Sequence, residues 1–244
     1  MGLRKIIKLF SKGNVCVTGL RGDGKDMLIA NVVCRRKLSY VSNVDYGGKW
    51  YPLDLDLLDC GKNTYRDFIS GNVKYYRYPY PDGTDVYVSD VGIYFPSQYC
   101  NELNKFIPYM ATFQAISRHV GKCNFHINVQ NLNRAWDKIR EQSDIYIMTR
   151  GCIVIFGFVF QLVRIYDQYD ACVKRVKPFS VNVPLIGSGA TRYNVRLQRA
   201  TYEANHGYIK NMFLIYKNKS KYNTRFFKDM LENGRKEDNS YEKY

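Results

Sequence analysis

The sequence predicts an α/β protein: a mostly parallel β-sheet with helices on both faces, plus a basic C-terminal extension. Two observations predict this class. Apolar runs of strand length alternate with helix-length segments over residues 13–177, and repeated strand–helix–strand units give parallel strands with helices packed on the sheet. A glycine-rich segment at 19–26 directly follows the first apolar run. In such a sheet, ligands bind at the carboxyl ends of the strands, where this segment is expected.

The first half of the domain starts with a strand at 14–18, which Gly19 directly follows. A helix over 26–38 follows, because no glycine or proline interrupts that segment. β-Branched and aromatic residues favour strands over 40–44 and 85–89. Between them, 45–63 is polar and turn-rich, and we expect a short helix around 64–70.

The second half contains a long helix over 101–119, a strand at 124–129 and a helix over 134–142. Two further strands follow, at 145–148 and 152–165, with a turn at Thr149–Arg150–Gly151 between them. The apolar run from 152 to 163 is shorter than the roughly 20 residues that span a membrane. It is rich in Ile, Val and Phe, which indicates a buried strand.

Two terminal segments flank this domain. Residues 1–12 place apolar side chains at helical spacing opposite basic ones. We expect this short amphipathic helix to pack on its own domain, the alternative being a membrane surface. Residues 178–244 form the basic, partly helical extension, with a helix around 222–231.

The net charge indicates the kind of partner, and the cysteine pattern limits the kinds of site that the chain can form. The chain has 37 Lys and Arg against 22 Asp and Glu, a formal net charge of +15, which favours a polyanionic partner. No acidic residue lies between 171 and 202, so we expect this stretch to contact the phosphate backbone of a nucleic acid, the alternative being a solvated surface. The seven cysteines are scattered without a C-x-x-C pair, which excludes a disulfide framework or zinc site.

Residues 19–25 read G-x-x-x-x-G-K, the pattern of a P-loop. Backbone N–H groups of such a loop and its lysine bind phosphate, and the following helix adds its positive dipole end. The predicted ATP-binding residues are Gly19, Arg21, Gly22, Asp23, Gly24, Lys25 and Asp26. Asp90 ends the 85–89 strand, at the place where a carboxylate holds the magnesium of a bound nucleotide. Asp26 is a second candidate Mg²⁺ ligand, since it replaces the usual Ser or Thr.

Several motifs in this order resemble the zonular occludens toxin (Zot)-like family, the filamentous-phage assembly ATPases of the FtsK/HerA group of P-loop NTPases. They cover about residues 13–165: 18–25, Asn43, Ser89–Asp90 with Phe95–Pro96, 118–121, Val129–Gln130 and 138–140.

The resemblance implies roles for individual residues. Lys25 and the loop amides would bind the β- and γ-phosphates, and Asp90 would orient Mg²⁺. Gln130 would sense the γ-phosphate, and Arg118 or Arg140 would donate a charge to a neighbouring subunit's nucleotide. It also implies a homo-oligomeric ring in the host cytoplasm, peripheral on the inner face of the membrane, with a phage coat or membrane assembly partner.

Two departures from the family concern hydrolysis. Val91 stands where the family has a water-orienting Glu, and Asp26 brings negative charge close to the phosphates. Glu102 and Asp85 are candidate substitutes for the missing Glu. We therefore expect nucleotide binding more than fast turnover. Two other functions stay open: a soluble genome-packaging ATPase of an icosahedral phage, and a nucleotide-binding adaptor without motor activity.

Overall fold

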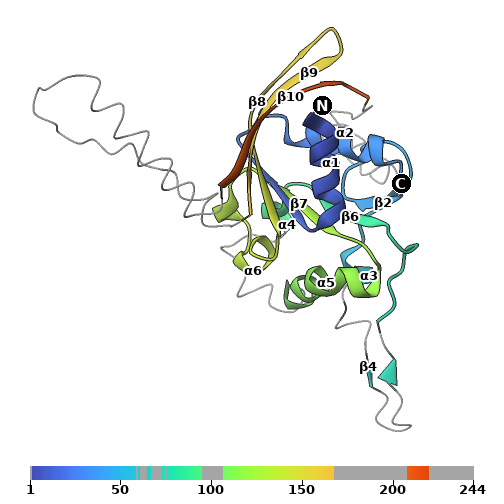
Figure 1. Ribbon diagram of the computed structural model, residues 1–244. Helices are drawn as coiled ribbons and strands as arrows, with labels where there is room; N and C mark the ends of the chain where they lie inside the picture. The colour runs from blue at the N-terminus through green and yellow to red at the C-terminus, as the bar shows by residue number, and fades with distance from the viewer. Residues whose placement is uncertain are drawn as a thin grey trace, which may run out of the picture.

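The computed structural model describes residues 2–58, 60, 65–66, 73–74, 76–94, 107–167 and 208–219. Eight strands form one sheet in the order β10-β9-β8-β1-β7-β6-β2-β3 (Figure 1). Their bounds are β1 Val15–Thr18, β2 Tyr40–Ser42, β3 Trp50–Pro52, β6 Asp85–Val88, β7 Phe125–Val129, β8 Ile145–Ile155, β9 Phe158–Tyr166 and β10 Tyr208–Lys217. The strands from β8 to β3 pair in parallel, whereas β9 pairs antiparallel with both β8 and β10. The mostly parallel sheet is thereby confirmed.

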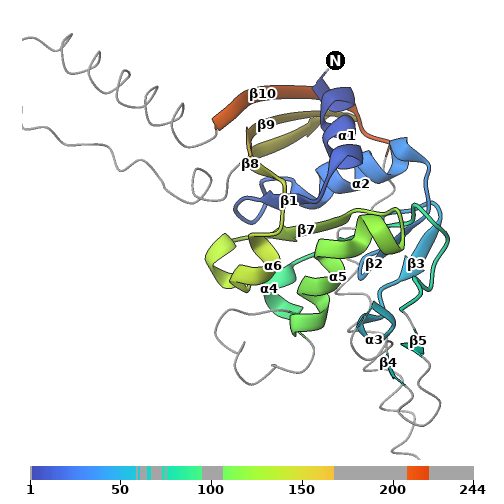
Figure 2. The same ribbon diagram turned by 60° about the horizontal axis from the view of Figure 1, so that its bottom comes forward.

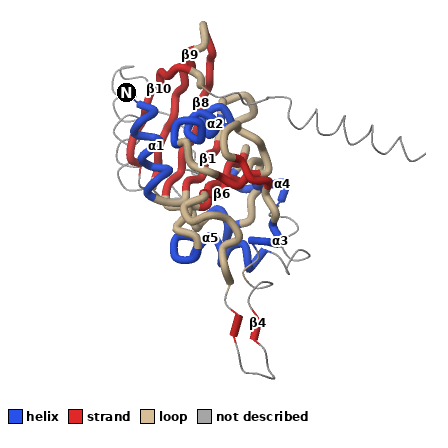
Figure 3. The backbone as a smooth tube through the Cα atoms, turned by 90° about the vertical axis from the view of Figure 1, so that its right-hand side faces the viewer, coloured by secondary structure: helices blue, strands red, loops and turns tan. Residues whose placement is uncertain are grey.

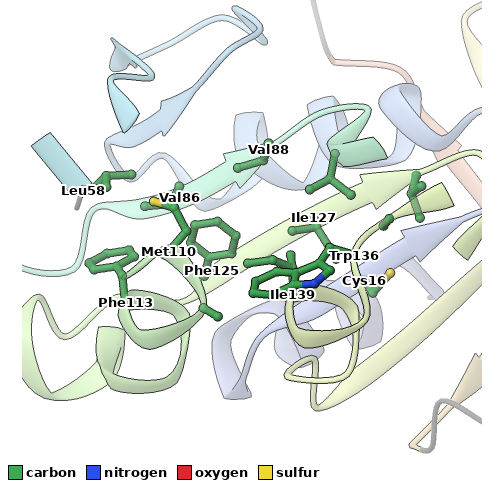
Figure 4. Packing of buried hydrophobic residues seen from close by; sticks show 14 of the residues in the cluster. Cys16, Leu58, Val86, Val88, Met110, Phe113, Phe125, Ile127, Trp136 and Ile139 are labelled. Carbon is green, nitrogen blue, oxygen red and sulfur yellow. The ribbon is translucent and has the colours of Figure 1, made fainter. Parts of the chain in front are cut away.

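Helices cover both faces of the sheet, as predicted (Figure 2). On one face, α1 (Gly2–Lys12) and α2 (Lys25–Arg36) pack in one apolar cluster with the sheet. On the other face, α5 (Ile107–Val120) and α6 (Asp137–Arg140) pack in a second cluster with β6 and β7. Figure 4 shows this second cluster, in which Phe113 of α5 and Trp136 lie against Phe125 and Ile127 of β7.

The N-terminal helix packs on its own domain, as expected. Leu3, Ile6 and Phe10 of α1 are buried, while its basic residues Arg4, Lys5, Lys8 and Lys12 are exposed. Within the described part of the chain, no helix is long and apolar enough to cross a membrane.

Short elements complete the fold. They are α3 (Leu55–Leu58), α4 (Val91–Tyr94), the 3₁₀ turn η1 (Leu132–Arg134) and the small ladder of β4 (Tyr65–Arg66) with β5 (Val73–Lys74). The helix expected around 64–70 is wrong at residues 65–66, because these pair across this ladder. The helix expected at 134–142 is divided between η1 and α6.

The turn expected at 149–151 is also wrong. Strand β8 continues through these residues with a register shift between Thr149 and Cys152. The chain reverses at Phe156–Gly157, where both residues have positive φ, 48° and 74°. A two-residue loop of this kind follows the natural twist of the paired strands, so the long apolar run is a hairpin and not one strand.

Strand β10 lies in the segment that we assigned to the C-terminal extension, where we expected no strand. Its side chains alternate, with Met212, Leu214 and Tyr216 buried and those between them exposed. The helix around 222–231, the basic stretch at 171–202, Phe95–Pro96 and Glu102 lie outside the described residues.

Candidate functional site

The glycine-rich loop connects β1 to α2 at the carboxyl edge of the sheet. Gly22 and Gly24 have φ values of 86° and 78°, and Gly24 is the N-cap of α2. A Cβ atom at Gly24 would lie 2.5 Å from Cβ of Cys152, so strand β8 packs directly on the loop. Both the backbone conformation and this close contact require glycine at position 24.

Lys25 is the first residue of α2 and only 5% exposed. Its Nζ donates to the carbonyl oxygens of Gly19 and Leu20, at 3.1 Å each. The ammonium group is thus held inside the loop, next to the positive end of the helix dipole. Arg21, also predicted to bind nucleotide, is exposed at the loop surface.

Asp26 is fixed in place by neutral donors. Its Oδ1 accepts hydrogen bonds from Asn128 Nδ2 at 2.7 Å, Ser89 Oγ at 3.0 Å and Tyr46 Oη at 3.3 Å. Asn43 in turn donates to the Ser89 carbonyl and accepts from its N–H. The ends of β2, β6 and β7 therefore all contribute to one polar network around this carboxylate.

Asp90 follows β6 and belongs to the same network. Its backbone N–H donates to Asn128 Oδ1 at 2.6 Å. Burial and the nearby charge of Asp26 raise the pKa of Asp90, while Lys25 and a hydrogen bond with Gln130 partly oppose this shift. Gln130 ends β7 and is exposed. The structure thus brings Lys25, Asp26, Asp90 and Gln130 together.

The donor set suits Mg²⁺. Burial, and after it the nearby charge of Asp26, raise the pKa of Asp90, and a divalent cation between the two carboxylates would offset both effects. Mg²⁺ in nucleotide sites keeps several waters and takes only one or two protein carboxylates. No cluster of three His, Cys, Asp or Glu side chains that could hold a metal occurs among the described residues. Asp26 and Asp90 would hold the ion and neutralise phosphate charge through it.

Three residues that the sequence analysis missed support the loop from β8, β9 and β10. Gln161 is fully buried, and its Nε2 donates to the carbonyl oxygens of Asp23 and Gly24, at 3.0 Å each. Its Oε1 accepts from Tyr216 Oη at 3.1 Å. Thr149 Oγ1 donates to the Thr18 carbonyl at 3.2 Å. A glutamine inside an apolar run was the available signal for Gln161.

The structure does not bring the two candidate arginines to the loop. Arg118 pairs with Asp144 at 2.6 Å, and the same carboxylate accepts from the N–H of Asn14, which precedes β1. This pair therefore lies at the amino edge of the sheet. Arg140 Nη1 donates to the carbonyl oxygens of Leu132 and Ala135, at 3.0 and 3.1 Å, and so closes the turn between η1 and α6.

Neither Val91 nor Asp85 supplies a carboxylate to the site. Val91 is fully buried in the apolar cluster under α5 and α6. Asp85 begins β6, at the amino edge, where it pairs with Arg36 and contacts His126. The idea that Asp85 replaces the missing Glu is therefore wrong, because the length of β6 separates it from Asp90.

The loop follows β1, the Asp follows β6, and β7 with Gln130 lies between these two strands. The loop, Asp90 and Gln130 thus follow neighbouring strands at one edge of the sheet. No protein-family model and no curated protein sequence matches the chain.

Solved structures similar to the chain include a zonular occludens toxin domain, a viral genome-packaging NTPase and ATPases of EssC. The N-terminal domain of zonular occludens toxin from Neisseria meningitidis has 11% identity and a TM-score of 0.43, over 88% of this chain and 97% of that one. The genome-packaging NTPase B204 of Sulfolobus turreted icosahedral virus 2, in complex with AMPPCP, has 15% identity and a TM-score of 0.40, over 64% and 93%. ATPases 2 and 3 of EssC from Geobacillus thermodenitrificans have 10% identity and a TM-score of 0.37, over 81% and 45%. At these identities the likeness concerns the fold alone.

Proposed function

We propose that the chain is a nucleotide-binding ATPase of the kind used in phage assembly, and that it binds ATP with Mg²⁺ at the P-loop. One observation carries the proposal: Lys25 is held inside the loop, and the Asp26–Asp90 pair lies at the same edge of the sheet. A buried lysine in the loop with two carboxylates close to it is suited to a magnesium–triphosphate ligand.

Each group has a role in this proposal. Lys25 and the N–H groups of the loop bind the β- and γ-phosphates. Asp26 and Asp90 hold Mg²⁺, and Gln130, bonded to Asp90, responds to the γ-phosphate. Arg118 sits half-exposed at the amino edge, so it would reach a nucleotide only in a neighbouring subunit of a ring.

The resemblance of the motifs extends the proposal to virion assembly. A ring would act on viral DNA through the basic stretch at 171–202, in the host cytoplasm and peripheral on the inner face of the membrane, together with a coat or membrane partner. A soluble packaging ATPase would share the nucleotide site and differ in its partner, so co-purification with capsid or with membrane separates the two.

One observation favours a second candidate, a nucleotide-binding adaptor that turns over slowly or not at all. Val91 is buried in the core, and Asp85 lies at the far edge. Among the described residues, the carboxylates near the loop are Asp23, Asp26 and Asp90. Asp23 accepts from the loop N–H of Leu20, and the other two are placed to hold Mg²⁺.

The test is ATP binding and hydrolysis with and without Mg²⁺ and single-stranded DNA, comparing the wild type with Lys25→Ala. Lys8→Ala, an exposed lysine on α1, is the matched control. If single-stranded DNA stimulates ATP hydrolysis by the wild type and by Lys8→Ala but not by Lys25→Ala, the chain is an ATPase. If ATP binding depends on Lys25 but no protein hydrolyses ATP, the chain is an adaptor. If Lys25→Ala binds ATP as well as the wild type does, the proposed nucleotide site is refuted.

A further inference from the structure

The hairpin of β8 and β9 carries an apolar surface that nothing in the nucleotide site uses. Phe156 at its turn is 98% exposed. Around it and on the adjoining face of the sheet lie further exposed apolar side chains: Ile153, Val154, Ile155, Phe158, Leu162, Phe213 and Ile215. We call residues 153–158 the hairpin tip. It projects beyond α1 and α2 (Figures 1 and 3).

An exposed apolar patch of this extent marks an interaction surface. Successive side chains of a strand point to opposite faces, and Ile153, Val154 and Ile155 are exposed by 63%, 48% and 47%. The tip therefore presents apolar groups on both of its faces and at its end. A protein docked on one face would leave the other in water, whereas a hydrocarbon layer covers both.

The charges beside the tip fit an anionic surface. Lys217 pairs in register with Phe158, and Lys219 follows it on the same strand end, both exposed. Arg35 of α2 donates to the Lys217 carbonyl at 2.9 Å, so a third cation lies there. Residues 145–166 and 208–219 contain no acidic residue. Basic residues next to an inserted apolar segment bind anionic lipid head groups.

The backbone of the tip is paired on the side of β9 and β10. Ile155 pairs with Phe158 across the two-residue turn, and the carbonyl of Gly157 accepts from the N–H of Asn218 at 2.7 Å. The other edge of β8 pairs with β1 at Ile145–Met148, and none of the described strands pairs with that edge at the tip. The tip therefore suits the interfacial layer, where water and head groups can hydrogen-bond this edge, and not the hydrocarbon core. From Ile153 to Phe156 the strand extends about 10 Å at its usual rise, comparable to the roughly 5–10 Å that interfacial segments enter a bilayer.

We propose that the hairpin tip inserts into the interface of an anionic lipid bilayer, with Lys217, Lys219 and Arg35 at head-group level. The inference depends on the proposed function for its setting, a peripheral ATPase at the host membrane. It moves the membrane contact away from α1, whose apolar side is buried in the domain.

The experiment is flotation of the full chain with phosphatidylcholine vesicles, with and without phosphatidylglycerol, in the absence of nucleotide. We expect binding to the anionic vesicles, and about tenfold weaker binding for Phe156→Ser, since a buried aromatic side chain contributes that much or more. Leu38→Ser, which removes an apolar side chain that is 50% exposed elsewhere, is expected to bind vesicles like the wild type.

Two further measurements keep the outcomes separate. ATP binding by Phe156→Ser equal to that of the wild type shows a folded protein. Lys25→Ala is expected to float with the vesicles while failing to bind ATP, so a failure of the nucleotide proposal leaves this one standing. Equal flotation of Phe156→Ser and wild type, or no flotation of the wild type, overturns the proposal. The proposal is also overturned if the wild type does not bind vesicles but self-associates, and Phe156→Ser abolishes this self-association. In that case a second copy of the chain covers the tip.

Discussion

The side-chain amide of Gln161 donates to the carbonyl oxygen of Gly24 at 3.0 Å and so joins strand β9 to the glycine-rich loop. A second bond from the same nitrogen reaches the Asp23 carbonyl, and Tyr216 of β10 holds the other end of the amide. The two strands beyond the parallel part of the sheet thus determine the shape of the loop, although neither contributes a residue that would touch a phosphate.

Replacing Gln161 with Leu is expected to loosen the loop. The change leaves two loop carbonyls and the Tyr216 hydroxyl without this partner, which costs about 1–3 kcal/mol of unfolding free energy. We expect ATP affinity about tenfold weaker, on the same energy scale. Urea denaturation and ATP titration measure the two effects. Tyr216→Phe is the control, because it removes only the hydrogen bond from the Tyr216 hydroxyl to Gln161 and leaves the two bonds to the loop. An unchanged ATP affinity in Gln161→Leu would show that the loop keeps its shape without Gln161.

Asp90→Asn is expected to stabilise the Mg²⁺-free protein and to abolish Mg²⁺-dependent ATP binding. Burial and the charge of Asp26 raise the pKa of Asp90 above its ordinary value of 3.8, so the ionised group opposes folding at neutral pH. A carboxyl group with a raised native pKa contributes stability below its unfolded pKa, and this contribution is lost as pH rises through the native pKa. Asparagine also tolerates the positive φ of this position, 48°.

Thermal unfolding of the Asp90→Asn protein and of the wild type, without Mg²⁺ and from acid to neutral pH, tests how their difference in stability changes with pH. The advantage of Asp90→Asn is expected to be largest at neutral pH and to shrink as pH falls. Asp82→Asn, at a surface ion pair, is the control. A wild type that is the more stable of the two at neutral pH without Mg²⁺ would contradict the repulsion.

The sequence was sufficient to predict how the central site assembles. Lys25, Asp90 and Gln130 follow three strands that the alternating pattern makes parallel, and the carboxyl ends of parallel strands meet at one edge. Asp26 was correctly placed at this edge by the same reasoning. Asp85 lies at the opposite edge, as the first residue of β6; the predicted strand over 85–89 already placed it there, so the hypothesis that it replaces the missing Glu conflicted with the predicted strand.

The support from β9 and β10 could not be predicted in the same way. Gln161 and Tyr216 meet because β10 pairs with β9 in a particular register, and some forty residues separate the two strands in the sequence. A continuous apolar run also hid the turn at Phe156–Gly157, since only the positive φ of both residues marks it. Non-local pairing and backbone conformation, not composition, decide these features.

Arg36→Met is expected to destabilise the protein strongly. Arg36 and Asp85 form a buried ion pair, with side chains 10% and 4% exposed. Burial by itself raises the pKa of Asp85, but its contact with His126 and the charge of Arg36 outweigh this effect, and the pKa is lowered. Removing Arg36 leaves a buried carboxylate without its cation, which costs about 3–5 kcal/mol.

Urea denaturation of Arg36→Met measures this cost. The matched control is Lys122→Met, which breaks the exposed Lys122–Asp82 pair and is expected to leave the unfolding midpoint unchanged. Similar small changes in both variants would show that the buried pair does not hold the amino end of β6.

Val91→Glu is expected to unfold the protein partly and not to restore hydrolysis. Although Val91 directly follows Asp90, its side chain is fully buried in the cluster below the sheet. A carboxylate at this position loses its hydration without gaining a partner, which costs several kcal/mol. Ile93→Glu is the matched control, because Ile93 lies on the same short helix and is 73% exposed; the same charge there stays in water. Thermal melting followed by circular dichroism, and the rate of ATP hydrolysis, are measured for both variants. A Val91→Glu protein with wild-type stability and faster turnover would contradict the prediction. Position 91 would then belong to the active site, and the argument for the adaptor would be lost.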